Sequence, residues 1–295
     1  MAHGLFVGLI TLDCIYQVDH VPSSDEKTVA EDCLLVAGGP ATNAAVAFRY
    51  LGNSAQIVGG LGQHPVTSLI RTDLAAQGVE IYDLLPGQTA SPSLSTILVT
   101  AGTGDRAVVS RNAVNSQADP EQLSADLLDG VEGVLIDGHQ MAVGTQIARL
   151  ARQRQIPVIL DAGSWKPGFE NLLPLATSVI ASARFLPPGC QSLKDTLDYL
   201  EQLGIPEIAI TRGTKPILYS LGSQRASLPV PTVTAKDTLG AGDIFHGAFC
   251  HYRLQGSTFQ AALILASVIA ARSCQSFGTR AWMNDPWSPP EPASH

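Results

Sequence analysis

The chain has 295 residues, of which 45% are hydrophobic and 15% are charged, and its formal net charge is −8. This is the composition of a globular protein with a substantial core, and no apolar run reaches the roughly 18 residues that a membrane span needs. The negative charge and the lack of a basic patch argue against nucleic acid or an anionic membrane as a partner, because both require clustered lysine and arginine.

The start of the chain and its cysteines bear on its compartment. Met1-Ala2-His3-Gly4-Leu5 has no basic region before its short apolar run, which therefore predicts a first strand and not a signal peptide. The five cysteines are odd in number and include no C-x-x-C pair, so neither a disulfide framework nor a zinc site is indicated. We expect a cytoplasmic protein with reduced thiols.

Short apolar runs alternate with helical patterns along most of the chain, which predicts an α/β fold with a mainly parallel sheet covered on both faces. One domain spanning residues 1–295 is expected. The predicted strands are Leu5–Ile10, Ala55–Gly60, Gly133–Asp137, Pro157–Asp161, Ser178–Ala181 and Glu207–Thr211. The predicted helices are Ala41–Leu51, Thr67–Gln77, Val143–Gln153, Leu193–Leu203, Asp243–Leu254 and Phe259–Cys274.

Two stretches break this alternation, at about residues 14–36 and 91–111. Their predicted strands are Tyr16–Asp19, Thr28–Val36, Leu94–Thr100 and Arg106–Ser110. Inserts this small cannot hold a core of their own, so we expect them to form a β lid over the carboxyl edge of the sheet or to pair with another subunit. Residues 284–295 contain four prolines, which predicts an extended or frayed tail.

Two segments in the first part of the chain carry polar groups suited to a polyol. Asp13 follows the first predicted strand, at the edge where open α/β sheets bind ligands, and a carboxylate there can accept two vicinal hydroxyls. Gly38 and Gly39 end a strand before a helix of small residues, in which Asn43 can both donate to and accept from hydroxyls. An exposed loop carboxylate and close helix packing by the glycines are the alternative interpretations.

The segment Gly59-Gly60-Leu61-Gly62 also follows an apolar strand and raises the possibility of a dinucleotide-binding dehydrogenase. Its spacing is not G-x-G-x-x-G, and it does not follow the first strand. No acidic residue ends a later strand at the expected distance, so this class is disfavoured.

The most informative segment is Asp237-Thr238-Leu239-Gly240-Ala241-Gly242-Asp243. The amides of Gly240, Ala241 and Gly242 can approach an anion at the positive end of a helix. Asp243, on the same first turn, would repel a phosphate unless it accepts a proton from an attacking hydroxyl. The segment therefore indicates phosphoryl transfer, with a glycine-rich turn before a charged helix start as the alternative.

Taken in this order, Gly8 and Asp13, then Gly38-Gly39-x3-Asn43, then Asp237 to Asp243 resemble the ribokinase-like carbohydrate kinases, also called the phosphofructokinase-B family. The resemblance extends from Gly4 to about Ala281. It implies a three-layer ribokinase-like sandwich with a small β lid, and an ATP-dependent sugar kinase that uses Mg²⁺.

The resemblance also implies roles for individual residues. Asp243 matches the catalytic base, and Gly240, Ala241 and Gly242 match the anion hole. The other matched positions are Asp13, Gly39 and Asn43 for the sugar, Thr211, Gly213 and the segment Cys274 to Gly278 for the nucleotide, and Arg111 as a lid arginine at the substrate or the transferred phosphate.

Two departures separate this chain from many relatives. The region Ile180–Pro188 contains no glutamate, where relatives carry an Asn-x-x-Glu that orients Mg²⁺, so no metal ligand is predicted here. Pro216 replaces the last glycine of the T-x-G-x-x-G turn that begins at Thr211. The branch that resembles ketohexokinases also lacks the glutamate, which favours a ketose or a pentose as the substrate.

Two alternatives to a sugar kinase stay open at this point: a nucleoside kinase of the same family, and a catalytically weak relative that only binds a sugar. For the oligomeric state, the expectation is a homodimer formed through the lid. Few large apolar residues are present in the predicted lid, which favours a compact sugar over a nucleoside.

Overall fold

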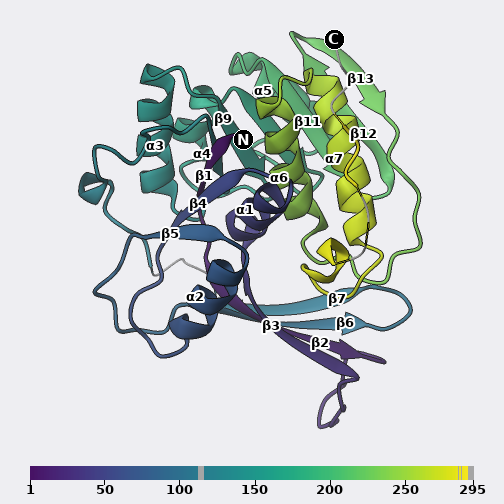
Figure 1. The fold of residues 1–295 in the computed structure, drawn as a ribbon. Helices are drawn as coiled ribbons and strands as arrows, with labels where there is room; N and C mark the ends of the chain where they lie inside the picture. Colours follow the sequence, from purple (N-terminus) through teal and green to yellow (C-terminus); the bar gives the residue numbers. More distant parts are fainter. Residues whose placement is uncertain (112–115, 285, 287, 292–295) are drawn as a thin grey trace.

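The structure is a computed structural model that describes residues 1–111, 116–284, 286 and 288–291. A nine-stranded sheet runs through its centre (Figure 1). From one edge to the other its strands are β13 (Gln224–Leu228), β12 (Lys215–Leu221), β11 (Glu207–Arg212), β10 (Ser178–Ser182), β9 (Val158–Ala162), β8 (Gly133–Ile136), β1 (His3–Val7), β4 (Ser54–Gly59) and β5 (Val79–Asp83).

The sheet is parallel from β5 to β11, and only β12 and β13 add to it in the antiparallel sense. In the middle of the sheet, Val7 pairs with Val58 on one side and with Ile136 on the other. The central strands are buried along almost their whole length, which is why their sequences are continuous apolar runs without alternation.

Helices cover both faces of this sheet. Successive residues of β1 point to opposite faces, so Phe6 packs with α1 and α6, whereas Leu5 and Val7 pack with α3 and α4. One layer holds α1 (Pro40–Tyr50), α2 (Thr67–Ala76), α6 (Ala241–Leu254) and α7 (Phe259–Ser273), and the other holds α3 (Met141–Gln153), α4 (Phe169–Leu172) and α5 (Leu193–Gln202). Short 3-10 helices occur at Pro120–Gln122, Leu173–Leu175 and Ala281–Met283. The predicted three-layer α/β sandwich is confirmed.

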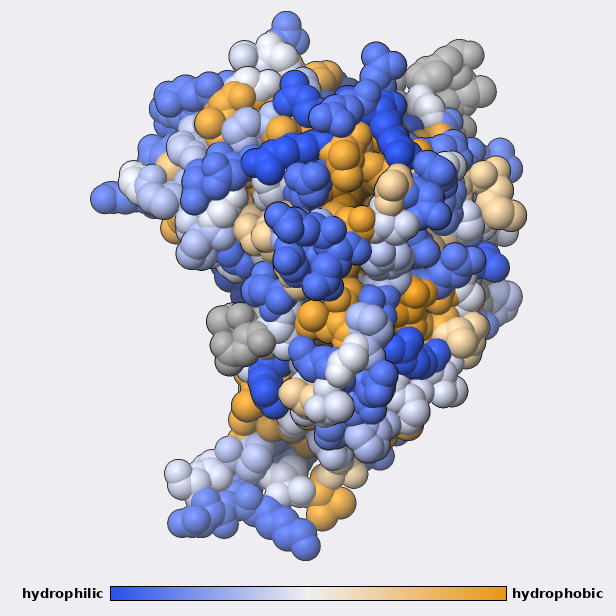
Figure 2. Space-filling view, turned by 90° about the vertical axis from the view of Figure 1, so that its left-hand side faces the viewer, coloured by the Kyte–Doolittle hydropathy of each residue, from blue (hydrophilic) through white to orange (hydrophobic). Residues whose placement is uncertain are grey.

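A second sheet of four strands projects from the body (Figures 1 and 2). Its inner face carries Ile15, Ile97 and Val99, which pack against Leu239 and Phe277 of the body. In spatial order its strands are β3 (Asp32–Gly38), β2 (Thr11–Val18), β6 (Ser93–Thr100) and β7 (Arg106–Arg111). We call this sheet the lid.

The structure differs from the predicted elements at several boundaries. The first strand ends at Val7, not at Ile10, and the lid strand β2 begins at Thr11, so Asp13 lies on a lid strand and not in a loop after the first strand. The lid strand predicted at Thr28–Val36 lies at Asp32–Gly38. An unbroken apolar run does not reveal where a chain leaves one sheet for another. The sequence analysis also missed the edge strands β5 and β13, which are only five residues long, and β12, which lies between β13 and β11.

The tail is described only in part, because residues 285, 287 and 292–295 lie outside the described residues. Within the described part, the Tyr252 hydroxyl donates to the Pro290 carbonyl at 2.8 Å, which ties the tail to α6. No helix among the described residues is both long and apolar enough to cross a membrane.

Candidate active site

The first turn of α6 leaves several amides without a protein acceptor. Gly240 has φ +70°, and a Cβ there would lie 2.8 Å from Thr279, so glycine is required to begin the helix. Within the described residues, the amides of Gly240, Gly242 and Asp243 donate to no protein group, and that of Ala241 has only a long contact of 3.4 Å to the Thr238 carbonyl. This cluster of amides at a helix N-terminus can bind an anion.

Asp243 lies beside these amides and is held by a chain of side chains. Asn43 Nδ2 donates to Asp243 Oδ2 at 2.9 Å, and Arg280 Nη1 donates to Asn43 Oδ1 at 3.0 Å. The arginine therefore fixes which end of the Asn43 amide faces the carboxylate. Burial and the nearby charge of Asp161 raise the pKa of Asp243 to about 7. Such a carboxyl can accept a proton near neutrality.

A cavity of about 280 Å³ opens in front of Asp243, between the lid and the start of α1. Asp13 lines it and is only 4% exposed, yet its Oδ1 has no hydrogen-bond partner among the described residues. Burial raises the pKa of Asp13 to about 6. A buried carboxylate oxygen that faces a cavity without a partner is suited to accept a ligand hydroxyl. The cavity is lined by Leu9, Thr11, Asp13, Gly39, Pro40, Asn43, Ser95, Ile97, Val108, Ser110, His139, Leu239 and Asp243. We call it the small cavity.

The paired glycines make room for this site. A Cβ on Gly38 would lie 1.9 Å from Asp13 Oδ2, and Gly39 has φ +104° with its Cβ position 2.3 Å from the Leu9 carbonyl. Close packing and the binding site therefore need the same two glycines.

Gly8 has a related role that the sequence analysis did not explain. Its Cβ position is 2.0 Å from the Asp137 carboxylate, which accepts the amides of Leu9, Ala41 and His139 at 2.8 to 3.1 Å. Burial acts to raise the pKa of Asp137, but His139, the Leu9 amide and the charge of Lys166 outweigh it and hold the pKa at about 2. The buried Asp137 braces the segment between β1 and β2 against the start of α1.

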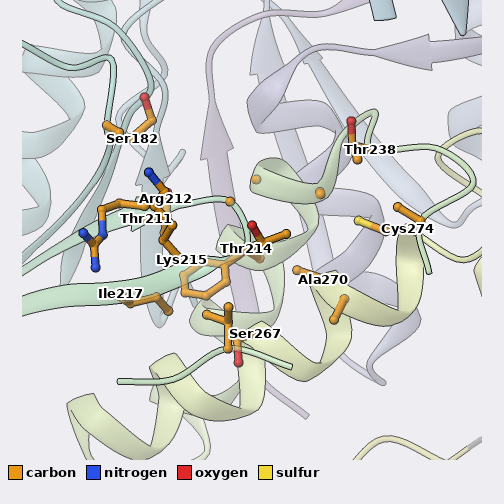
Figure 3. A pocket seen from close by; sticks show the side chains of 18 of the residues that line it. Ser182, Thr211, Arg212, Thr214, Lys215, Ile217, Thr238, Ser267, Ala270 and Cys274 are labelled. Atoms are coloured by element: carbon orange, nitrogen blue, oxygen red, sulfur yellow. The ribbon is translucent and has the colours of Figure 1, made fainter. Parts of the chain in front are cut away.

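A larger cavity of about 660 Å³ lies on the other side of the α6 start. Thr211, Gly213 and Cys274, three residues for which the resemblance implies nucleotide contacts, all line it. Figure 3 shows Thr211 and Arg212 at one end of it and Cys274 at the other. Four of its described lining residues are basic (Arg106, Arg184, Arg212 and Lys215) and none is acidic, which favours a polyanion. We call it the large cavity.

Gly278 does not line either cavity. Its amide donates to Asp237 Oδ2 at 2.8 Å, and Asp237 Oδ1 accepts the amide of Leu239. Gly278 therefore shapes the loop before α6 from behind.

Arg111 is exposed and lies outside the lining of both cavities. Strand alternation explains this, because Val108 and Ser110 of β7 face the small cavity and Arg111 points to the other face of the lid. Arg106 shares the inner face, lines the large cavity, and donates to Thr238 Oγ1 at 2.7 Å and to the Thr238 carbonyl at 3.0 Å. The structure thus brings Arg106 to the site and not Arg111, whose role stays a prediction.

Sequence reasoning missed four residues of this site: Arg106, Asp137, His139 and Arg280. Side chains of a strand alternate between its two faces, so Arg106 lies on the same face of β7 as Val108 and Ser110, and this alternation would have identified it. No local pattern marks Arg280, because its partners Asn43 and Asp73 lie more than 200 residues away in the chain.

The described residues do not fit a preformed Mg²⁺ site. They contain no group of three His, Cys, Asp or Glu side chains that could hold a metal ion, and the lining of the large cavity offers no carboxylate. Mg²⁺ in nucleotide sites is commonly held by one or two carboxylates together with substrate phosphates. We therefore assign no residue to Mg²⁺.

The fold and the site define a phosphotransferase in which a helix N-terminus and a carboxylate face a polar cavity. Residues 1–286 match the pfkB family carbohydrate kinases, and the chain belongs to this family. It is thus a carbohydrate kinase, an enzyme that transfers a phosphoryl group to an alcohol of its acceptor.

Three relatives illustrate the likeness. The ribokinase of Bacillus subtilis (strain 168) is 28% identical over 286 residues, which cover 94% of each chain. A protein from Agrobacterium tumefaciens, provisionally described as a ribokinase, has a crystal structure that superposes with a TM-score of 0.84 at 29% identity, over 96% of this chain and 94% of that one. The ribokinase of Arabidopsis thaliana, solved in complex with ribose and ATP, superposes with a TM-score of 0.76 at 21% identity, over 94% of each chain, and shows a shared fold.

Proposed function

We propose that this protein is an ATP-dependent kinase for a small free sugar, of the pentose type. One observation carries the proposal: the turn from Gly240 to Asp243 borders both cavities. Ala241 and Gly242 line the large cavity, and Asp243 lines the small one. A nucleotide in the first and a sugar in the second would meet at this turn.

The chain's own groups account for most of the reaction. Asp243 accepts the proton of the attacking hydroxyl, while the amides at the start of α6 hold the transferred phosphoryl group. Arg106, on the lid, neutralises charge on the phosphates from the opposite side. Mg²⁺ is expected to enter with the phosphates of ATP and to reduce their charge.

The small cavity supports a compact, hydroxyl-rich acceptor. Asp13, Asn43 and Asp243 supply acceptors and a donor, while Ser95 and Ser110 add hydroxyl groups from two lid strands. Leu9, Ile97, Val108 and Leu239 form most of the apolar wall, and no phenylalanine, tyrosine or tryptophan among the described residues lines the small cavity. A nucleoside base usually needs an aromatic or large apolar slot, so a sugar is favoured over a nucleoside.

The similarity to ribokinases supports a pentose over a ketohexose. The free Oδ1 of Asp13 and the elevated pKa of Asp243 support a working kinase over a relative that only binds sugar.

An assay of ADP release with MgATP and a panel of ribose, deoxyribose, arabinose, fructose and adenosine tests this function. We expect the highest kcat/KM with one of the aldopentoses. Preference for adenosine, or sugar binding in a thermal-shift measurement without any ADP release, would replace the proposal by one of its alternatives.

We also propose that two chains pair through the outer face of the lid. Leu35 and Val109 lie on this face and are 54% and 78% exposed. Apolar side chains at these levels on an uncovered sheet face favour a partner. Sedimentation of the purified protein would show a dimer, and a concentration-independent monomer would contradict it.

A further inference from the structure

Two ionisable side chains lie behind Asp243 and take no part in the steps above. Asp161 is the second-last residue of β9 and is 6% exposed, and His246 lies on α6, one turn after Gly242, and is 5% exposed. Groups of this kind are costly to bury unless they pair, so their arrangement calls for an explanation.

Both ring nitrogens of His246 lie against acceptors. Nδ1 lies 2.6 Å from the Gly242 carbonyl oxygen, and Nε2 lies 3.3 Å from the Ile180 carbonyl oxygen and 3.6 Å from Asp161 Oδ1. Carbonyl oxygens only accept hydrogen bonds, so each ring nitrogen must donate. The geometry is that of an imidazolium, a buried cation next to a buried carboxylate.

Both charges act on Asp243. Burial and the Asp161 charge raise the pKa of Asp243, while Asn43 and the charges of His246 and Arg106 lower it. The ionisable groups that face Asp243 are Asp161 on β9, His246 on α6, Arg106 on β7 and Arg280 after α7. Those that face Asp161 are His246, Asp137 after β8, and His139 and Lys166 in the loops after β8 and β9.

We propose that Asp161 and His246 are positioning residues for the base: His246 ties the start of α6 to the sheet, and the two side chains place opposite charges behind the Asp243 carboxyl. This inference rests on the proposed role of Asp243 as the base. Burial raises the pKa of Asp161 itself, and the charge of His246 opposes that rise. As an anion, Asp161 disfavours the ionised form of Asp243 and so makes it a stronger base, and the charge of His246 limits this effect.

His246 has a second effect on the same turn. Its Nδ1–H holds the Gly242 carbonyl within the helix and its Nε2–H holds the Ile180 carbonyl of β10, so the ring ties the start of α6 to the sheet. The amides that bind the phosphoryl group are thereby held at a fixed distance from the carboxylate.

The test is the pH dependence of kcat/KM for wild type, Asp161→Asn, His246→Gln and the double variant. Activity should rise with pH as Asp243 loses its proton. This rise is the acid limb of the profile. Its midpoint should fall by about one pH unit in Asp161→Asn and should increase by about the same amount in His246→Gln. The double variant should return close to the wild-type limb.

His251→Gln is the matched control. His251 lies on the same helix, but its Nδ1 is 2.8 Å from Asn53 Nδ2, on the far side from the site. We expect no displacement of the acid limb. Loss of rate without displacement in Asp161→Asn and His246→Gln, or displacement in the same direction, would overturn the inference.

A titration of the Asp243 carboxyl by ¹³C NMR, in the protein without substrates, compares the Asp243 midpoint of wild type and variants without any turnover. It also decides the case if His246→Gln fails to fold, because Asp161→Asn alone must then lower the Asp243 midpoint. If wild type phosphorylates no acceptor, the proposed function fails, and the titration still tests the charge pair.

Discussion

The nine-stranded sheet and the lid sheet share one site but differ in what covers them. The strands in the middle of the central sheet are covered on both faces by helices, and β8 and β9 are buried throughout. In the lid, β7 is exposed at five of its six residues, and the sheet packs on the body through a small apolar cluster on its inner face and, at its base, through Leu12 and Ala37, which belong to the larger core. The first is a rigid support, and the second is a thin layer with few buried contacts.

This difference matches the division of tasks in the site. The base and the amide cluster need fixed geometry, and both belong to α6, which is packed against α1 and α7 in the core. Asp13 lies on the largely buried strand β2, whereas Arg106 lies on β7, which is mostly exposed and is therefore the part of the lid that is freest to move. The lid is thus suited to admit a sugar and then complete the site around it.

The largest effect should come from the rigid part. We expect Asp243→Asn to lower kcat by about 10³-fold or more, because a base contributes mainly in the transition state. Binding of ATP, measured by calorimetry, should change little. Turnover close to wild type would remove the role assigned to Asp243, and loss of ATP binding would point to a structural role.

On the lid, Asp13→Asn should act on the sugar. We expect the KM for sugar to rise by about 10- to 100-fold, which corresponds to the loss of charge-assisted hydrogen bonds, with a smaller change in the KM for ATP. Asp19→Asn is the control, since Asp19 follows the same strand but its side chain is 67% exposed. Equal effects of the two variants, or an unchanged sugar KM for Asp13→Asn, would contradict the proposed grip.

The two regions were also unequally predictable from the sequence. Continuous apolar runs and helical periodicity were enough for the central strands and their helices, and the anion-binding turn at Gly240 to Asp243 was evident because its chemistry is local. In the lid, apolar and polar residues mix, and β3 lies several residues beyond its predicted start. Which face of a lid strand meets the site depends on register, which a single sequence does not contain.

Long-range contacts were the other source of error. Arg280 reaches Asn43, and Asp137 braces the start of α1, across 237 and 96 residues of sequence. Neither contact has a sequence pattern, because only the folded sheet brings these side chains together.

The register of β7 supplies the finest test of the comparison, through two arginines of one strand. We expect Arg106→Gln to lower kcat/KM by about 10-fold, because it loses a charged donor at the lid and phosphate side of the site. Arg111→Gln should change it by less than about twofold, since an exposed side chain on the outer face contributes little. Ser110 faces the small cavity, and its neighbour Arg111 therefore points to the other face of β7. A large effect of Arg111→Gln would mean that β7 twists or shifts when substrates bind. It would also restore the role first predicted for Arg111, and the lid would then have to be treated as a sheet whose register changes between its open and closed forms.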